Sequence, residues 1–468
     1  TSEILADAIA ASFSLTQSQS GSSVSGSIGV AVADNDISNE ARAAISGVDV
    51  TTSANGVTLD ADSIATIKAN AVSASLGVSS SQSGTSANFS ADVSLAYNKV
   101  ESTVEAVIEN ADVSGPGAIS LTASDATDID ANIVAAKLAI TASSSGSAGG
   151  LSVAATNAEN EVDNTTRAVI DNASVSGSSF DAHADSTTSI NVNAVSAAVS
   201  VASGGSWALS GSGTGAGATN DISNVILAGA VNGSSVDVTG NADITALNSA
   251  TIDANVIAAS ASVTSGSSGS ISLNVVVALA DNVIDTTTSA LVEDSVLSAG
   301  GSLNIDAQGG GTINVTGVAA SLSVATGSGS LNVNASVIVA LVTNTVNGKV
   351  DALIRDSKVA DGQGVIAGAT TISAAHTTQL SATNVAASIS VTNGGEMNFG
   401  VNVTAAVNTN TIGTAVNAGI MDSDLDASGA VDIDVNSAAT ATAVVVAASV
   451  TIATGGSING AISGAGAR

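Results

Sequence analysis

The sequence contains no cysteine, one proline and very few aromatic residues. The absence of cysteine excludes disulfide scaffolds, cysteine-ligated zinc and thiol catalysis. Aromatic residues make up 1% of the 468 residues, so the large side chains that fill most globular cores are scarce. The apolar content is still 44%, mainly alanine and valine, and such small side chains suit thin, closely spaced layers.

Basic residues and long apolar runs are also scarce. Nine lysines and arginines stand against 40 acidic residues, and the net charge of −31 repels phosphate backbones, which excludes nucleic acid as a partner. The best apolar stretch, Ala443–Ala453, has only 11 residues and includes Ser449 and Thr451. A membrane-crossing helix needs about 18, so no membrane-spanning segment is predicted.

Two patterns recur along the chain at one spacing. An asparagine followed two residues later by Ile or Val returns every 60 to 66 residues, at Asn35, Asn98, Asn160, Asn220, Asn282, Asn344 and Asn410. The pattern A-A-S-x-S-V, as in Ala319–Val324, returns with the same period. We therefore predict repeats of about 62 residues, with boundaries 1–34 (partial), 35–97, 98–159, 160–219, 220–281, 282–343, 344–409 and 410–468 (incomplete).

Two irregularities accompany the repeat. Extra residues at 356–368 are interpreted as an enlarged surface loop. Because the chain starts and ends within a repeat, we expect it to be a segment of a much longer protein.

Within each repeat the apolar residues alternate with period two, which predicts strands rather than helices. The apolar phase changes within a repeat. Before Asn98 the apolar residues stand at odd-numbered positions, such as Phe89, Val93 and Tyr97, and after it they stand at even-numbered ones, such as Val100. We interpret this change as the chain switching its buried face at a corner, a bulge or a crossing between layers. Five aromatics at alternating positions are expected to fill local gaps: Phe13, Phe89, Tyr97, Phe180 and Phe399.

Each repeat is predicted to contain two extended passes of about 20 residues, joined by Ser/Gly and Asn/Asp/Gly turns. Two all-β architectures fit. In a β-solenoid, equivalent residues of successive coils stack about 4.8 Å apart, and the recurring asparagines form an amide ladder. In a long antiparallel β-hairpin array, equivalents lie two strands apart, about 9.6 Å. We favour the solenoid, because stretches such as 110–114 and 118–123 are typical of short coil faces separated by glycine turns.

Few residues are candidates for a catalytic or metal-binding site. His183 lies between Asp181 and Asp185 on one strand face, a hint of a pH-sensitive or metal-binding spot, and the other histidine is His376. Acidic clusters that offer oxygen ligands to Ca²⁺ are Asp60/Asp62, Asp125/Asp128/Asp130, Asp422/Asp424/Asp426 and Asp432/Asp434. The calcium-binding glycine-rich nonapeptide is absent, so a solvated strand face is the simpler interpretation of these clusters. We predict no enzyme and no cofactor, with Ca²⁺ left open.

The repeating units N-x-[IV], S-x-V-x-A-x-G and A-A-S-x-S-V resemble the repeat regions of very large secreted bacterial surface proteins, the adhesin, haemagglutinin-like and haemolysin-like repetitive β proteins. The resemblance implies export, an extracellular or cell-surface location and a structural or adhesive role. It departs from the filamentous haemagglutinin type, whose coil is shorter, and from the calcium nonapeptide type.

The sequence thus predicts a rigid extracellular stalk, fibre, sheath or matrix filament with an acidic solvent face. Its expected partners are copies of itself or neighbouring repeats, joined by strand addition, and cell-surface or matrix glycans. The alternative is an adhesive module that binds glycan or Ca²⁺ along an Asp/Asn-rich face.

Overall fold

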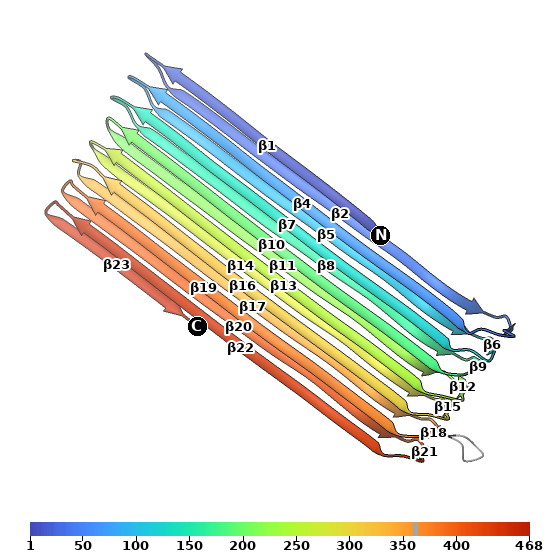
Figure 1. The fold of residues 1–468 in the computed structure, drawn as a ribbon. Coiled ribbons are helices and arrows are strands. Elements are labelled where there is room, and N and C mark those ends of the chain that lie inside the picture. Colours follow the sequence, from blue (N-terminus) through green and yellow to red (C-terminus); the bar gives the residue numbers. More distant parts are fainter. Residues whose placement is uncertain (359–363) are drawn as a thin grey trace.

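The chain folds as a parallel β-solenoid, as expected from its repeat. A computed structural model describes residues 1–358 and 364–468, and these residues form three parallel sheets and contain no helix. Each 62-residue repeat makes one coil, with one long strand in sheet A, one long strand in sheet B and one short strand in sheet C (Figure 1).

The strands of sheets A and B are 24 or 25 residues long except at the two chain ends, longer than the two passes predicted. Sheet A consists of β1 (Ser2–Ser18), β4 (Val57–Ser81), β7 (Ile119–Ser143), β10 (Phe180–Gly204), β13 (Ala242–Gly266), β16 (Leu303–Thr326), β19 (Thr370–Asn393) and β22 (Val431–Thr454). Sheet B consists of β2 (Ser23–Ser46), β5 (Ser86–Glu109), β8 (Ala148–Asp171), β11 (Trp207–Val231), β14 (Gly269–Glu293), β17 (Leu331–Arg355), β20 (Met397–Met421) and β23 (Ile458–Ala467).

Sheet C forms a third, short side of each coil; the two extended passes predicted per repeat do not include it, but residues 110–114 were interpreted as a short coil face of this kind. The sheet consists of β3 (Val50–Thr51), β6 (Asp112–Ser114), β9 (Ser174–Gly177), β12 (Ser235–Val238), β15 (Val296–Ala299), β18 (Val365–Ala367) and β21 (Leu425–Ala427). Strand β18 lies inside the segment predicted as an enlarged surface loop, so that part of the prediction is wrong. The centre of the segment, residues 359–363, lies outside the described residues.

Every strand pairs with its equivalents one repeat before and after it. Ile190, for example, lies beside Ile129 in one neighbouring strand and Ile252 in the other, and all these pairings are parallel. A hairpin array would place antiparallel strands side by side, so that alternative is wrong. Identical small residues stack because each coil rests on a near-copy of itself.

The long strands make the molecule a broad plate. A strand of 25 residues spans roughly 80 Å at about 3.3 Å per residue, whereas eight stacked strands about 4.8 Å apart span only about 34 Å. Figure 1 shows the long strands aligned across the stack, with sheet C at one end of the coils and the Ser/Gly turns at the other.

The interior changes along each long strand. In the core half, the part of each coil on the sheet C side, the inward residues are mostly Ile, Val, Leu and Ala from all three sheets, such as Ile108, Val113 and Leu121. The serine half is the part on either side of the turn joining sheet A to sheet B. It comprises residues 9–32, 72–95, 134–157, 195–217, 257–279, 318–341, 385–407 and 446–467.

The predicted change of buried face does not occur. In β5, Ser90, Ser94 and Asn98 are buried. Val100 and Val104, further along the strand and also at even-numbered positions, are buried too. The strand therefore keeps one side inward throughout. What changes is the chemistry, because the serine half places Ser and Asn inward and its apolar residues outward.

The repeat-marking asparagines mark this change of chemistry in sheet B. The amide Nδ2 of each donates to Oδ1 of the next, from Asn35 to Asn410, at 2.7 to 2.9 Å. All but Asn410 are at least 95% buried. The six bonds form a continuous amide ladder along the stacking axis.

Candidate functional site

The outer surface of sheet A carries a continuous apolar area over the serine half. Four outward positions per strand, separated by two residues each, form four columns across eight strands. We call this area the apolar face. Its first column is Ile9, Val72, Val134, Val195, Ile257, Val318, Val385 and Val446, and its fourth is Leu15, Val78, Ile140, Val201, Val263, Val324, Val391 and Ile452.

The two middle columns form a groove beside a ridge. The second column is alanine in every strand: Ala11, Ala74, Ala136, Ala197, Ala259, Ala320, Ala387 and Ala448. The third column is larger in all but one strand: Phe13, Leu76, Leu138, Val199, Ala261, Leu322, Ile389 and Val450. Two apolar hollows, of about 350 and 510 Å³, lie over the alanine column.

The outer surface of sheet B is also apolar over the serine half, but this surface is interrupted. Phe89, Leu151, Leu273 and Val275 point outward and are 43 to 51% exposed. Strand β11 instead presents outward glycines between its neighbours, such as Gly211, where a Cβ would lie 2.8 Å from Leu151 Cδ1. Of the two long sheets in the described part of the chain, sheet A therefore has the apolar outer surface that no strand interrupts.

The interior beneath these surfaces is polar and hydrogen bonded. Hydroxyl groups of both sheets meet there: Ser262 of β13 contacts Ser210 and Ser272 of sheet B at 2.8 Å, and Ser272 also contacts Ser323 of β16 at 2.8 Å. A buried hydroxyl is costly unless it is bonded, so these contacts hold the two sheets at a fixed spacing.

One buried ionisable pair lies in this polar interior. The Lys137 ammonium crosses two coils to donate to the Ser27 hydroxyl at 2.8 Å and to its carbonyl oxygen at 3.3 Å. Burial lowers the pKa of Lys137 to about 8 and raises the pKa of the Asp92 carboxyl. The charge of each group partly opposes the effect of burial on the other.

Charge is confined almost entirely to the core half. Of 40 acidic and nine basic residues, the serine half contains only Asp92, Lys137 and Glu396, with Arg468 at its border, and the first two face inward. The plate is therefore amphipathic along its length: one half has charged outer surfaces, and the other has uncharged, apolar ones.

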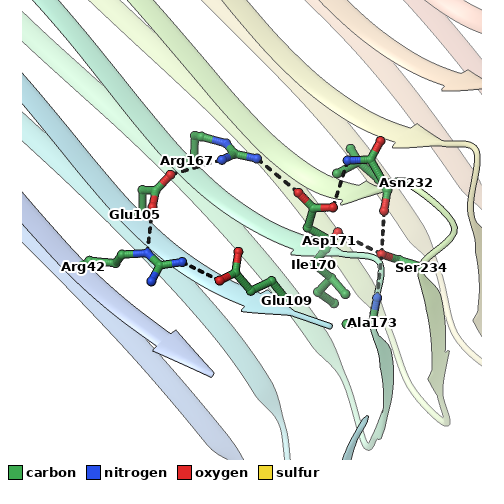
Figure 2. Close-up of polar contacts among 10 residues, drawn as sticks. Arg42, Glu105, Glu109, Arg167, Ile170, Asp171, Ala173, Asn232 and Ser234 are labelled. Carbon is green, nitrogen blue, oxygen red and sulfur yellow. Dashed lines mark hydrogen bonds and ion pairs between the residues drawn. The ribbon is translucent and has the colours of Figure 1, made fainter. Parts of the chain in front are cut away.

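Ion pairs tie neighbouring coils together on the charged half. Figure 2 shows Glu105 bound by Arg42 Nε at 2.9 Å and by Arg167 at 3.1 Å. Arg42 also binds Glu109 at 2.7 Å, and the pKa of Glu109 is lowered by a hydrogen bond from Ser46 and by this arginine. These are surface pairs, each worth about 0 to 1 kcal/mol, so they adjust coil-to-coil contact rather than dominate stability.

The two histidines lie apart and on opposite sides of sheet A. His183 faces outward on β10, as do Asp181 and Asp185. His376 faces inward on β19, where its Nδ1 lies 3.2 Å from Thr378 Oγ1 and burial lowers its pKa. Gly348 provides the space, since a Cβ there would collide with the His376 ring. The two imidazoles form no joint site.

The predicted acidic clusters mostly lie on outer surfaces. Asp60, Asp62, Asp422, Asp424, Asp426, Asp432 and Asp434 are exposed, whereas Asp128 and Asp130 are partly exposed and point outward from β7. Asp125 is the exception, since it faces inward and is fully buried. Within residues 1–358 and 364–468, no group of three or more His, Asp or Glu side chains is arranged to hold a metal ion.

The expectation that the aromatics fill gaps is wrong for most of them. Phe180 is buried, but Phe13, Phe89, Tyr97 and Phe399 face outward with 37 to 65% of their surface exposed, as does Trp207. All five outward aromatics occupy the serine half or its border, where most inward side chains are Ser, Ala, Thr or Asn. They add to the apolar outer surfaces.

Comparison of the chain with known protein families, with characterised proteins and with solved structures finds no match. No helix long and apolar enough to cross a membrane occurs among the described residues.

The apolar face was missed from the sequence because outward apolar residues were taken as inward ones. The constant alternation of A-A-S-x-S-V and the lack of charge around it are the signals that mark it.

Proposed function

We propose that this chain is a non-catalytic structural protein of the cell exterior, forming a stiff two-layer β-ribbon that serves as a stalk, sheath or matrix filament. The observation that supports this best is the unbroken register of eight coils, in which every long strand of sheet A or B pairs over most of its length with a neighbouring coil. A plate built this way has no internal hinge in the described residues.

Three further features support a structural role. The buried amide ladder joins seven coils with one bond per step, so bending the stack strains a chain of oriented hydrogen bonds. Hydroxyl groups of the serine half bond to one another across the two sheets, as Ser79 does with Ser23 and Ser86 at 2.9 Å. The net charge of −31 keeps the charged halves of neighbouring molecules apart and favours solubility.

Limited proteolysis with trypsin tests this proposal. Seven of the nine basic residues lie within long strands, and Lys358 lies between β17 and β18, outside any strand. We expect one early cut, after Lys358, with both fragments remaining associated through the parallel pairing of β17 with β20. EDTA is expected to leave this pattern unchanged. Rapid digestion at the strand positions Lys99, Arg167 or Lys349 would contradict a rigid ribbon.

A further inference from the structure

We propose that the apolar face of sheet A binds the same face of a second copy of this chain, with the strands of the two copies antiparallel and only the serine halves overlapping. The inference rests on the proposed structural role, which it extends by naming the partner and the surface. The shape, area and charge of the apolar face support a second copy as the partner, and a lipid surface fits it less well.

The columns are complementary to themselves in this arrangement. A two-fold axis along the stacking direction, placed between the second and third columns, exchanges first with fourth and second with third. The alanine groove of each copy then receives the larger third column of the other, so that Ala197 lies opposite Val199 of the partner subunit. Ridges of one sheet enter grooves of the next in sheet packings about 10 Å apart.

The area is large enough for a stable dimer. Four columns span about 20 Å along the strands and eight strands span about 34 Å, which gives roughly 700 Å² per copy and 1,400 Å² in total. Specific protein interfaces bury about 1,200 to 2,000 Å² in total. The apolar face contains no charged or hydrogen-bonding side chain, so its burial leaves no side-chain polar group unsatisfied.

Charge selects the antiparallel overlap. Each copy carries nearly all of its −31 charge in the core half, so parallel stacking would place two strongly acidic regions side by side. Antiparallel overlap of the serine halves puts the acidic halves at opposite ends of the dimer. The two acidic halves are then separated by several Debye lengths, and their repulsion is screened, because one Debye length is about 8 Å at physiological salt.

A lipid bilayer fits this surface less well than a second copy. The apolar face carries no Lys or Arg to bind lipid headgroups, and the net charge of −31 repels anionic membrane surfaces. The serine half also ends in polar turns of Ser and Gly with Glu396, which hydrocarbon does not accept.

Sedimentation equilibrium of the full chain tests the inference. We expect a reversible dimer with a dissociation constant in the micromolar range or below. Ala197→Glu, in the centre of the groove, is expected to raise that constant at least about 30-fold, since it buries an unpaired carboxylate, and Ala320→Glu is expected to do the same. The matched control Thr187→Glu lies on the same strand and outward side but beyond the overlap, and it is expected to change nothing.

Cross-linking tests the orientation. Because the chain has no cysteine, Ala197→Cys and Asp237→Cys each supply one thiol. A short bis-maleimide is expected to join two copies of Ala197→Cys and none of Asp237→Cys, which lies exposed on β12 at the charged end. Cross-linking of Asp237→Cys would overturn the antiparallel arrangement.

Three results overturn the inference. They are a monomer at all concentrations, a dimer unaffected by Ala197→Glu and Ala320→Glu, and a monomer that binds phosphatidylcholine vesicles through this face. Each variant is first checked for the wild-type trypsin pattern, which reports the fold. A trypsin-resistant monomer contradicts the dimer and leaves the structural role intact, whereas a trypsin-sensitive chain contradicts the structural role.

Discussion

Asp125 is a carboxyl group held inside the solenoid. Its Oδ2 accepts hydrogen bonds from Asn164 at 2.7 Å and from Thr127 at 3.3 Å, and burial raises its pKa from 3.8 to about 6. The folded state therefore binds a proton more tightly than the unfolded chain does. Stability from this group is greatest below about pH 4, falls as the pH rises to about 6 and stays reduced above that.

Replacing Asp125 with Asn removes the ionisation and keeps an oxygen that accepts both bonds. We expect Asp125→Asn to be more stable than the wild type at pH 7 by up to about 3 kcal/mol, and to differ little from it at pH 3.5. Urea unfolding at several pH values measures the difference, with exposed Asp62→Asn as the control. An equal difference at both pH values would contradict the assigned cause.

The long strands carry two environments within one element. Over the core half, inward Ile and Val and outward charges follow the usual alternation, whereas over the serine half the alternation is reversed. The reversal is possible because Ser, Gly and Ala are small enough for two sheets to lie close together. The amide ladder stands in sheet B where the two environments meet.

The ladder makes a prediction for a single strand. Asn220→Ala removes the middle member and leaves buried Asn160 Nδ2 and Asn282 Oδ1 without their partners. We expect a loss of about 2 to 4 kcal/mol in the free energy of unfolding, because each orphaned group costs about 1 to 3 kcal/mol. Chemical denaturation measures it. Thr219→Ala, one residue away and facing outward, is the control, and equal stability of the two variants would contradict a stabilising ladder.

Much of the element pattern could be predicted from the sequence. The repeat length, the strand periodicity and the stacking of equivalent asparagines follow from spacing alone. The burial side could not be derived this way, since period two separates two faces without saying which is inward. Val93 and Val100 look alike in the sequence, yet one faces solvent and the other the core. Sheet C is predicted only in part, through the short coil face at 110–114, because strands of two to four residues carry little alternation.

At the scale of the whole molecule, the chain is a plate with one charged and one uncharged half. The composition reflects this division. Acidic residues lie on the outer surfaces of the core half, and the scarcity of large side chains reflects the thin serine half. The sequence indicated an acidic solvent face but not its restriction to one end. That restriction appears only when the coils are stacked and the charged residues fall on one side of the ladder.

The central claim is that the serine half is inverted, with serines inside and apolar residues outside. Thiol reactivity along β5 tests it most directly, because the chain has no native cysteine and sheet B lies away from the proposed dimer contact. The account predicts that Phe89→Cys and Ala91→Cys react readily with a bulky maleimide in the native state, whereas Ser90→Cys and Ser94→Cys react only after unfolding in urea. The opposite pattern, with reactive thiols at 90 and 94 and protected ones at 89 and 91, would contradict the account.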